Sequence, residues 1–199
     1  NYINNNELLF NNNLNNIVEL ITLSDNQFKP NLIVKETWYN KLNVFLKSMI
    51  FYLLSFFVLG ISWMYQPKML RKISFYFLLG GFFLHSYGLS LRMIIMQRPP
   101  VSTLYESILF VCFVLLLFSI IFEYIRRDGL GILVGSIGGS ILHFIGLKYA
   151  VDGDTLGMLV AVLNSNFWLA THVTTITIGY GVSLAAGLMA HLYLIFSII

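Results

Sequence analysis

The chain has 199 residues, of which 57% are hydrophobic, 16% aromatic and only 11% charged. Soluble globular domains carry about 25% charged residues, so this composition excludes an ordinary soluble domain and predicts a membrane protein. The net charge of +3 is carried by basic residues beside apolar runs, without the basic stripe that binding of nucleic acid requires. The single cysteine, Cys112, excludes an intrachain disulfide, a multi-cysteine metal site and the CxxCH signal for haem attachment.

Residues 1–43 are expected to form an extracytoplasmic segment. Asparagine crowds its first twenty positions, and apolar residues recur there at helical spacing, so a short amphipathic helix and a solvated low-complexity stretch both remain open. The apolar residues at this spacing are Phe10, Leu14, Ile17 and Ile21. A second amphipathic pattern, around Trp38, leads toward the membrane. Because the chain starts at Asn and stops inside an apolar run without a cap, we expect it to be a piece of a longer protein.

Residues 44–199 contain apolar runs long enough to cross a membrane, which needs roughly 20 residues of helix. Their expected bounds are 44–65, 73–96, 103–124, 130–150 and 168–199. Polar or helix-breaking strings separate them, including QPKMLRK, QRPP and RRDG. The predicted fold class is therefore all-α, a polytopic transmembrane bundle of about five helices.

The orientation follows from the basic residues, because short cytoplasmic loops retain Lys and Arg. The richest clusters fall after the first and third runs: Lys68, Arg71, Lys72, Arg126 and Arg127. We therefore expect a multi-pass protein of the cytoplasmic (inner) membrane, in contact with lipid, with both of these loops in the cytoplasm and the amino-terminal segment outside. Several basic residues on the opposite side weigh against this orientation.

Histidines within apolar runs need a partner or a function, because polar groups are costly in hydrocarbon. His172 lies about one turn after Trp168, near the expected outer boundary, and Thr175, Gly179 and Ser183 share its face. A neutral imidazole there can ligate haem iron. It can equally bond to a neighbouring helix, and spacing alone favours that second interpretation.

The other histidines have packing interpretations. His85 shares a helix face with Gly81, Gly88 and Arg92, so it is a polar residue that joins helices or a contact for haem or quinone. His143 lies on a glycine-lined seam, which is typical of helix packing. His191 is close enough to the predicted cytoplasmic end to reach lipid headgroups.

Two arginines near the expected outer surface are candidate contacts for haem propionates. Arg92 and Arg98 have guanidinium groups that can form forked hydrogen bonds to carboxylates, but they also suit an interfacial anchor. HExxH, GxSxG and P-loop motifs are absent from the sequence, and no acid–base pair of carboxylates is evident. We therefore assign no catalytic residue.

Two strings carry a resemblance to a known family. The first is HSYGLSLRMIIMQRPPVSTLYESILFV, from His85 to Val111, and the second is LNSNFWLATHVTTITIGYGVSLAAGLMAHLYL, from Leu163 to Leu194. Together they resemble the CcsA/ResC family of System II cytochrome c biogenesis proteins, within the wider haem-handling superfamily. A weaker likeness at Glu36 to Phe45 resembles forms fused to a preceding CcsB-like region.

This resemblance implies binding of haem b and its delivery at the outer membrane face, for covalent attachment to the CxxCH motif of apocytochrome c. The intact family acts as a holocytochrome c synthase, with a CcsB/ResB-like subunit or fused region as a partner. In the family an external histidine precedes a WWD signature and is an axial haem ligand, and His172 falls in the matching string. The resemblance thus implies that His172 is an axial ligand of the haem iron, and it assigns no ligand role to His85. Trp168, Arg92, Arg98 and His85 are the further candidates for the haem site.

The sequence also departs from the family pattern. Its only tryptophans are Trp38, Trp63 and Trp168, so the WWD signature and the second external histidine are missing. We therefore expect residues 44–199 to be a CcsA-like region cut before WWD and inactive alone as a synthase. A haem exporter or chaperone without synthase activity, and a structural membrane subunit, remain alternatives.

Overall fold

The computed structural model describes residues 12–13, 16–17, 30–96, 99–101, 103–151, 167 and 169–198. These residues form helices and turns, with no β-strand in the described part of the chain. The all-α class predicted from the sequence is confirmed. The chain divides into two compact units, 1–42 and 43–199, and the first contains α2 (Pro30–Leu42). The amphipathic pattern predicted around residues 10–21 falls almost entirely outside the described residues.

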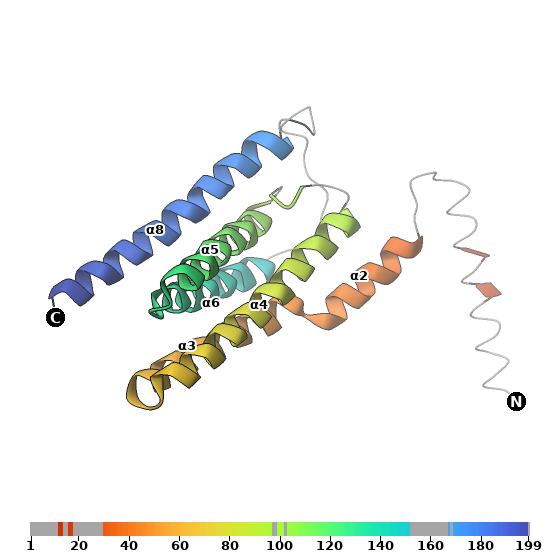
Figure 1. Cartoon of the computed structure of the whole chain (residues 1–199). Helices are drawn as coiled ribbons and strands as arrows, with labels where there is room; N and C mark the ends of the chain where they lie inside the picture. The colour runs from red at the N-terminus through yellow and green to blue at the C-terminus, as the bar shows by residue number, and fades with distance from the viewer. Residues whose placement is uncertain are drawn as a thin grey trace, which may run out of the picture. The chain divides into compact units, whose positions relative to one another are not determined.

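The second unit consists of long helices and one π-helical turn. Their bounds are α3 Val44–Met64, α4 Pro67–Met96, α5 Leu104–Arg126, α6 Leu130–Val151, η1 Leu169–Val173 and α8 Thr174–Ile198. Helix α3 packs against α4 and α6, while α5 packs against α6 and α8 (Figure 1). The α3–α4 and α5–α6 pairs are therefore hairpins joined by the α3–α6 contact, and α8 lies along α5.

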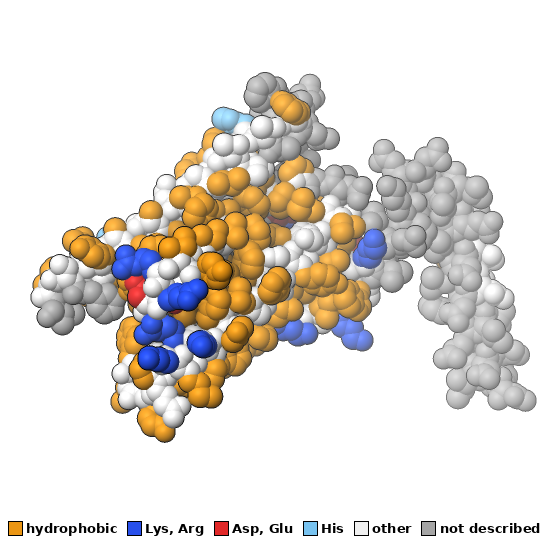
Figure 2. All heavy atoms as spheres, in the orientation of Figure 1, with side chains coloured by type: hydrophobic (Ala, Val, Ile, Leu, Met, Phe, Trp, Pro, Cys, Tyr) orange, Lys and Arg blue, Asp and Glu red, His pale blue; other side chains and the backbone are white. Residues whose placement is uncertain are grey.

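Five helical stretches in the described part are long and apolar enough to cross a membrane. They are Lys35–Met64, Pro67–Met96, Leu104–Arg126, Leu130–Ala150 and Thr171–Ile195. Large hydrophobic side chains are exposed along them, and Figure 2 shows that they cover much of the visible face. An apolar outer surface is what lipid contact requires, so the multi-pass character predicted from the sequence is confirmed.

The α3–α4 turn corrects one predicted boundary. Helix α4 begins at Pro67, so the prediction that the second apolar helix starts at Ile73 is wrong. Helix α3 ends at Met64, and Gln66, with φ of 46°, lies in the turn directly before α4. A proline suits the first helical position because its missing N–H has no intrahelical acceptor there. The basic residues of QPKMLRK consequently lie on the first turns of α4 instead of in a loop.

The α5–α6 hairpin is fixed by side-chain caps. Thr103 and Glu106 form a capping box at the start of α5, which satisfies backbone N–H groups that have no helical partner. At the other end the Glu123 carboxylate accepts hydrogen bonds from the N–H groups of Gly129, at 3.0 Å, and Gly131, at 3.2 Å. Gly129 has φ of 92°, a left-handed conformation that glycine adopts without strain. The turn therefore directs α6 back along α5.

The interior of the unit combines apolar packing with hydrogen bonds between helices. The buried apolar cluster comprises Tyr52, Leu59, Leu78, Cys112, Leu115, Leu116, Ile132, Leu133 and Ala185. The Ser55 hydroxyl of α3 donates to the Ser74 carbonyl of α4 at 2.9 Å, and the Ser74 hydroxyl donates back to the Ser55 carbonyl at 2.6 Å. Small polar residues that bond in this way hold membrane helices together.

Candidate functional site

Three potential metal-ligating side chains meet in the core of the second unit. His85 comes from α4, Cys112 from α5 and His143 from α6, and each is at most 1% exposed. One candidate donor atom from each residue lies within 4.8 Å of the other two. We call His85, Cys112 and His143 the core triad.

Hydrogen bonds define the state of the triad's histidines. The His143 Nδ1 atom lies 2.9 Å from the carbonyl oxygen of Gly139, and because a carbonyl only accepts, Nδ1 carries the proton. The same Nδ1 lies 3.4 Å from the Cys112 sulfur, and the Tyr52 hydroxyl lies 3.5 Å from the His85 Nδ1. Among the described residues neither Nε2 atom has a partner with hydrogen-bond geometry, although the Leu109 backbone lies near the His85 ring.

Glycines allow the helices that carry the triad to approach closely. A Cβ atom at Gly81 would lie 2.5 Å from the Tyr52 ring, and one at Gly139 would lie 3.1 Å from both Leu116 and Tyr52. On α4 the buried positions include Gly81, His85 and Gly88, so the shared face predicted from their spacing is the face that packs inward. The glycines thus place the Tyr52 ring of α3 beside the imidazoles.

Aromatic rings enclose the triad. The His85 and His143 ring centroids are 4.7 Å apart with perpendicular planes. Phe45 lies 5.5 Å from His85 and 6.0 Å from His143, while Tyr52 lies 5.2 Å from His143. Phe113 lies 6.2 Å from His85. With rings packed at these distances, the triad is a dry polar centre whose immediate surroundings are too crowded for a macrocycle.

A buried ion pair lies farther along the same two helices. The Arg92 Nη2 atom of α4 donates to the Glu106 carboxylate of α5 at 3.1 Å, and both side chains are at most 3% exposed. The guanidinium carbon also lies 4.9 Å from the centre of the Tyr105 ring. The guanidinium that the sequence offers to a haem propionate is therefore already bonded to a carboxylate.

His172 has different surroundings from the core triad. It is exposed and belongs to the π-helical turn η1, which leads directly into α8. Single π-helical turns occur frequently at functional sites. Thr175, Gly179 and Ser183 are exposed too, and a Cβ atom at Gly179 would meet nothing within 4 Å. No described residue therefore covers this face of α8.

The predicted site residues thus fall into separate places. His85 and Arg92 share the buried face of α4, whereas His172 is exposed at the start of α8. Arg98 and Trp168 lie outside the described residues. The described residues do not bring His172 together with His85 or Arg92 in one site.

The comparisons with known proteins identify relatives for about half of the chain. A CcsA cytochrome c biogenesis protein of Trieres chinensis is 33% identical over 107 residues, which are 53% of this chain and 34% of that protein. The corresponding protein of Guillardia theta is 36% identical over 97 residues, 48% of this chain and 32% of the relative. Protein NrfI of Wolinella succinogenes is 36% identical over 112 residues, 55% of this chain and 12% of NrfI. No protein-family model matches the chain.

These matches show that about half of the chain is similar to CcsA cytochrome c biogenesis proteins. The resemblance inferred from the two sequence strings is thereby confirmed. The alignments span about a third of the CcsA relatives' own length, so most of a CcsA protein lies outside the region matched here.

The proximity of Cys112 to His143 was not predicted from the sequence. Their positions along the two helices could have indicated that they lie at the same depth in the membrane. Cys112 lies eight residues after the start of α5, and His143 lies eight residues before the end of α6. Antiparallel helices joined by a short turn place such positions at one level, since each residue advances the helix by about 1.5 Å.

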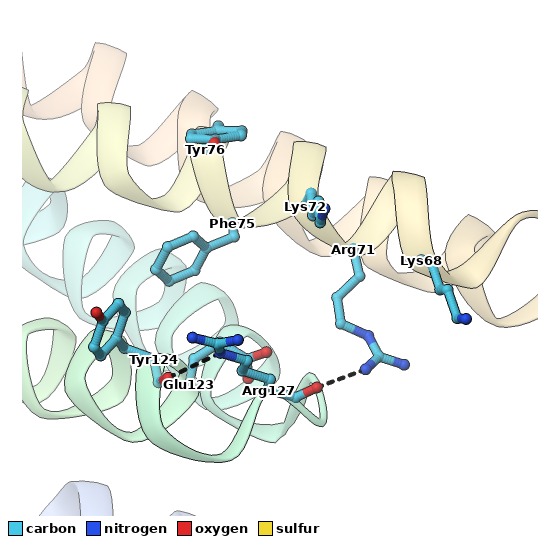
Figure 3. Close-up of a pocket in the computed structure, with 8 residues that line it drawn as sticks. All are labelled: Lys68, Arg71, Lys72, Phe75, Tyr76, Glu123, Tyr124 and Arg127. Carbon is cyan, nitrogen blue, oxygen red and sulfur yellow. Dashed lines mark hydrogen bonds between the residues drawn. The ribbon is translucent and has the colours of Figure 1, made fainter.

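A basic pocket lies between α4 and the α5–α6 turn (Figure 3). It has a volume of about 440 Å³ and is lined by Lys68, Arg71, Lys72, Phe75, Tyr76, Glu123, Tyr124 and Arg127. The Arg71 Nη1 atom donates to the Arg127 carbonyl at 2.7 Å. This contact ties α4 to the α5–α6 turn, so the basic residues of both predicted cytoplasmic loops gather at one end of the unit.

Proposed function

We propose that this chain acts in cytochrome c biogenesis by holding haem b at the outer face of the membrane, with His172 as an axial ligand of the iron. The observation that carries the proposal is the exposed imidazole of His172 in a π-helical turn, at the end of a helix apolar enough to span the membrane. A neutral imidazole is a common axial ligand of haem iron. The relatives are named as cytochrome c biogenesis proteins, which supports the pathway.

The open face of α8 supports the same role. A macrocycle needs a flat surface beside its ligand, and small side chains let it approach the helix backbone. Gly179 has open space where a Cβ atom would lie, and Thr175 and Ser183 expose only short polar side chains beside it. The core triad lacks such a surface, because aromatic rings surround both of its histidines.

The arginines are proposed as contacts of the haem propionates. Arg98 follows α4 in the chain, while Arg92 would have to exchange the Glu106 carboxylate for a propionate. Forked bonds from a guanidinium suit a carboxylate of either origin. Trp168, directly before η1, is proposed to line the same haem pocket.

Delivery of the haem to the CxxCH thiols of apocytochrome c, with a CcsB-like subunit or region beside it, is proposed for the whole protein. The matched region covers only about a third of the CcsA relatives. We propose that the haem pocket on the open face of α8 is completed by residues outside this matched region.

We further propose that the end with the basic pocket faces the cytoplasm and that the protein lies in the cytoplasmic membrane. Lys68, Arg71 and Lys72 line this pocket together with Arg127, and short basic loops are retained on the cytoplasmic side. With that end in the cytoplasm, α6 ends toward the outer face, and we propose that His172, at the start of α8, lies at the outer face too.

The experiment that tests haem ligation uses the full-length protein purified from membranes. We expect His172→Gly to lose haem, or to regain the wild-type absorption spectrum when imidazole is added, because free imidazole can fill the vacated ligand position. The matched control is His191→Gly, which removes an exposed histidine from the far end of the same helix. A haem spectrum unchanged in His172→Gly would falsify the assignment.

The orientation is tested by labelling a single cysteine placed at position 126 on a Cys112→Ser background. The Arg126 side chain is 57% exposed, so a cysteine there is accessible to reagents. We expect an impermeant thiol reagent to label it only after the cells are opened. Labelling of intact cells from outside would reverse the orientation.

A further inference from the structure

We propose that the core triad, His85, Cys112 and His143, binds one cuprous ion in the interior of the helix bundle. One side chain is contributed by each of α4, α5 and α6. The three residues are at least 99% buried. This site is distinct from the exposed His172 and independent of the proposed haem binding.

The spacing of the donor atoms is close to that of a three-coordinate metal site. Sulfur and imidazole ligands at about 2.3 and 2.0 Å from one ion, in a trigonal arrangement, lie roughly 3.5 to 4 Å from each other. The candidate donor atoms of the triad all lie within 4.8 Å of one another. This limit exceeds the spacing around an ion by about 1 Å, so binding requires the three side chains to rotate toward one another.

An unsatisfied lone pair points to a ligand. The His143 Nδ1 atom donates its proton to the Gly139 carbonyl, so its Nε2 atom carries a lone pair, and no described residue donates to it. Buried polar atoms without a partner are uncommon and call for an explanation. An Nδ1–H held by a backbone carbonyl is also the usual arrangement behind a histidine that binds a metal through its other nitrogen.

The identity of the donors favours copper. A thiolate is a soft ligand that selects copper(I) or zinc over magnesium, calcium or manganese, and two imidazoles with one thiolate form the trigonal ligand set of many copper sites. The sulfur of Cys112 and the two imidazoles provide this set.

The charge of the surroundings favours the monovalent ion. Cu⁺ with one thiolate and two neutral imidazoles has no net charge, whereas Zn²⁺ with the same ligands carries +1, which is costly in a medium of low dielectric constant. The charged residues that the structure describes as buried are Arg92, Glu106 and Glu123. The first two neutralise each other, and Glu123 caps the start of α6 eleven residues from Cys112. No described buried charge is therefore available to compensate for a divalent ion.

Binding releases one proton. The Cys112 thiol loses its proton as the copper–sulfur bond forms, while both imidazoles bind in their neutral form. The oxidation state of the ion does not change in this step. Phe45, Tyr52 and Phe113 pack around the histidines and exclude water, which further favours an uncharged complex.

The test is an anaerobic titration of the full-length purified protein with cuprous ion, in competition with a chromogenic copper(I) chelator. We expect wild type to withhold one equivalent of copper from the chelator. Cys112→Ser should lose this equivalent, and His143→Gln should weaken binding by at least about 10-fold, the lower end of the effect of losing even an outer-shell partner. The matched control is His191→Gln, because His191 makes the same backbone contact through Nδ1 at an exposed position.

X-ray absorption of the copper-loaded wild type provides a second measurement that does not depend on the folding of any variant. We expect one sulfur and two imidazole ligands around copper. Wild type without tightly bound copper, equal binding by a folded Cys112→Ser variant, or a copper centre without sulfur would overturn the proposal. Binding of zinc but not copper would overturn the choice of ion. The haem content of the same samples is measured as well, so that a failure of the copper proposal can be told apart from a failure of the haem proposal.

Discussion

His143 and His191 make the same local hydrogen bond in two different surroundings. Each lies four residues after a glycine, and each Nδ1 atom contacts that glycine's carbonyl oxygen, at 2.9 Å for His143 and 2.7 Å for His191. His143 is 1% exposed, whereas His191 is exposed. The local sequence therefore sets the rotamer of the ring, and the neighbouring helices decide whether it is buried.

The same contrast separates the α3–α6 bundle from the outer face of α8. In the bundle, polar groups bond across helix interfaces that glycines have brought together. On α8, a Cβ atom added at Gly179 or at Gly187 would meet nothing within 4 Å, and His172 is exposed. The bundle thus encloses the core triad, whereas Gly179 and His172 of the η1–α8 segment lie exposed.

The largest difference in stability is expected between variants that break a buried and an exposed ion pair. Arg92→Gln leaves the Glu106 carboxylate buried without its cation, and breaking a buried pair in this way costs about 3–5 kcal/mol. The matched change Arg126→Gln breaks the pair with Asp128, whose side chains are 57% and 31% exposed, and should cost about 0–1 kcal/mol. Thermal unfolding in detergent measures both losses. Equal destabilisation by the two changes would contradict the buried location of the Arg92 pair.

A smaller difference in stability is expected between two variants that replace a glycine by alanine. A Cβ atom at Gly131 would lie 2.5 Å from the Ser119 carbonyl oxygen and 2.7 Å from the Glu123 backbone nitrogen, so Gly131→Ala must separate α5 from α6. Overpacking of this kind costs about 1–3 kcal/mol. Gly187→Ala meets no atom and should stabilise α8 by up to about 1 kcal/mol through helix propensity. An unfolding midpoint that does not fall in Gly131→Ala would show that α5 and α6 are not in this close contact.

The smallest difference in stability is expected between two variants that replace a threonine by alanine. Thr103→Ala removes the capping box of α5 and should lower stability by about 1 kcal/mol. Among the described residues the Thr175 hydroxyl bonds to the Thr171 carbonyl, one turn earlier in the chain, so Thr175→Ala should leave stability nearly unchanged. The same unfolding measurement tests this pair, and a larger loss in Thr175→Ala would mean that the face of α8 is covered.

The sequence was sufficient to predict the fold class and most of the helix bounds. In hydrocarbon every backbone polar group needs an internal partner, so long apolar runs have few alternatives to helix. The start of α4 was not predictable in this way, because Pro67 and the basic residues after it occur both in loops and in first helical turns. The conformation of Gln66, φ 46°, decided the boundary.

The candidate sites were predictable only in part. Spacing placed Gly81, His85 and Arg92 on one face of α4, since such a face follows from the helical repeat alone. That Arg92 meets Glu106, and that Cys112 meets His143, depends on which helices face each other, and no single-helix pattern contains this information. The haem role of His172 stays a prediction, which rests on family resemblance and on the exposure of its ring.

The most direct measurement of the difference between the two regions is the haem-to-protein ratio of the full-length protein purified from membranes, compared between His172→Gly and His143→Gln. We predict that His172→Gly loses most of its haem, because it removes the ligand on the open face, and that a folded His143→Gln retains it. Haem retained by His172→Gly and lost from His143→Gln would contradict haem ligation on α8 and place the macrocycle in the bundle.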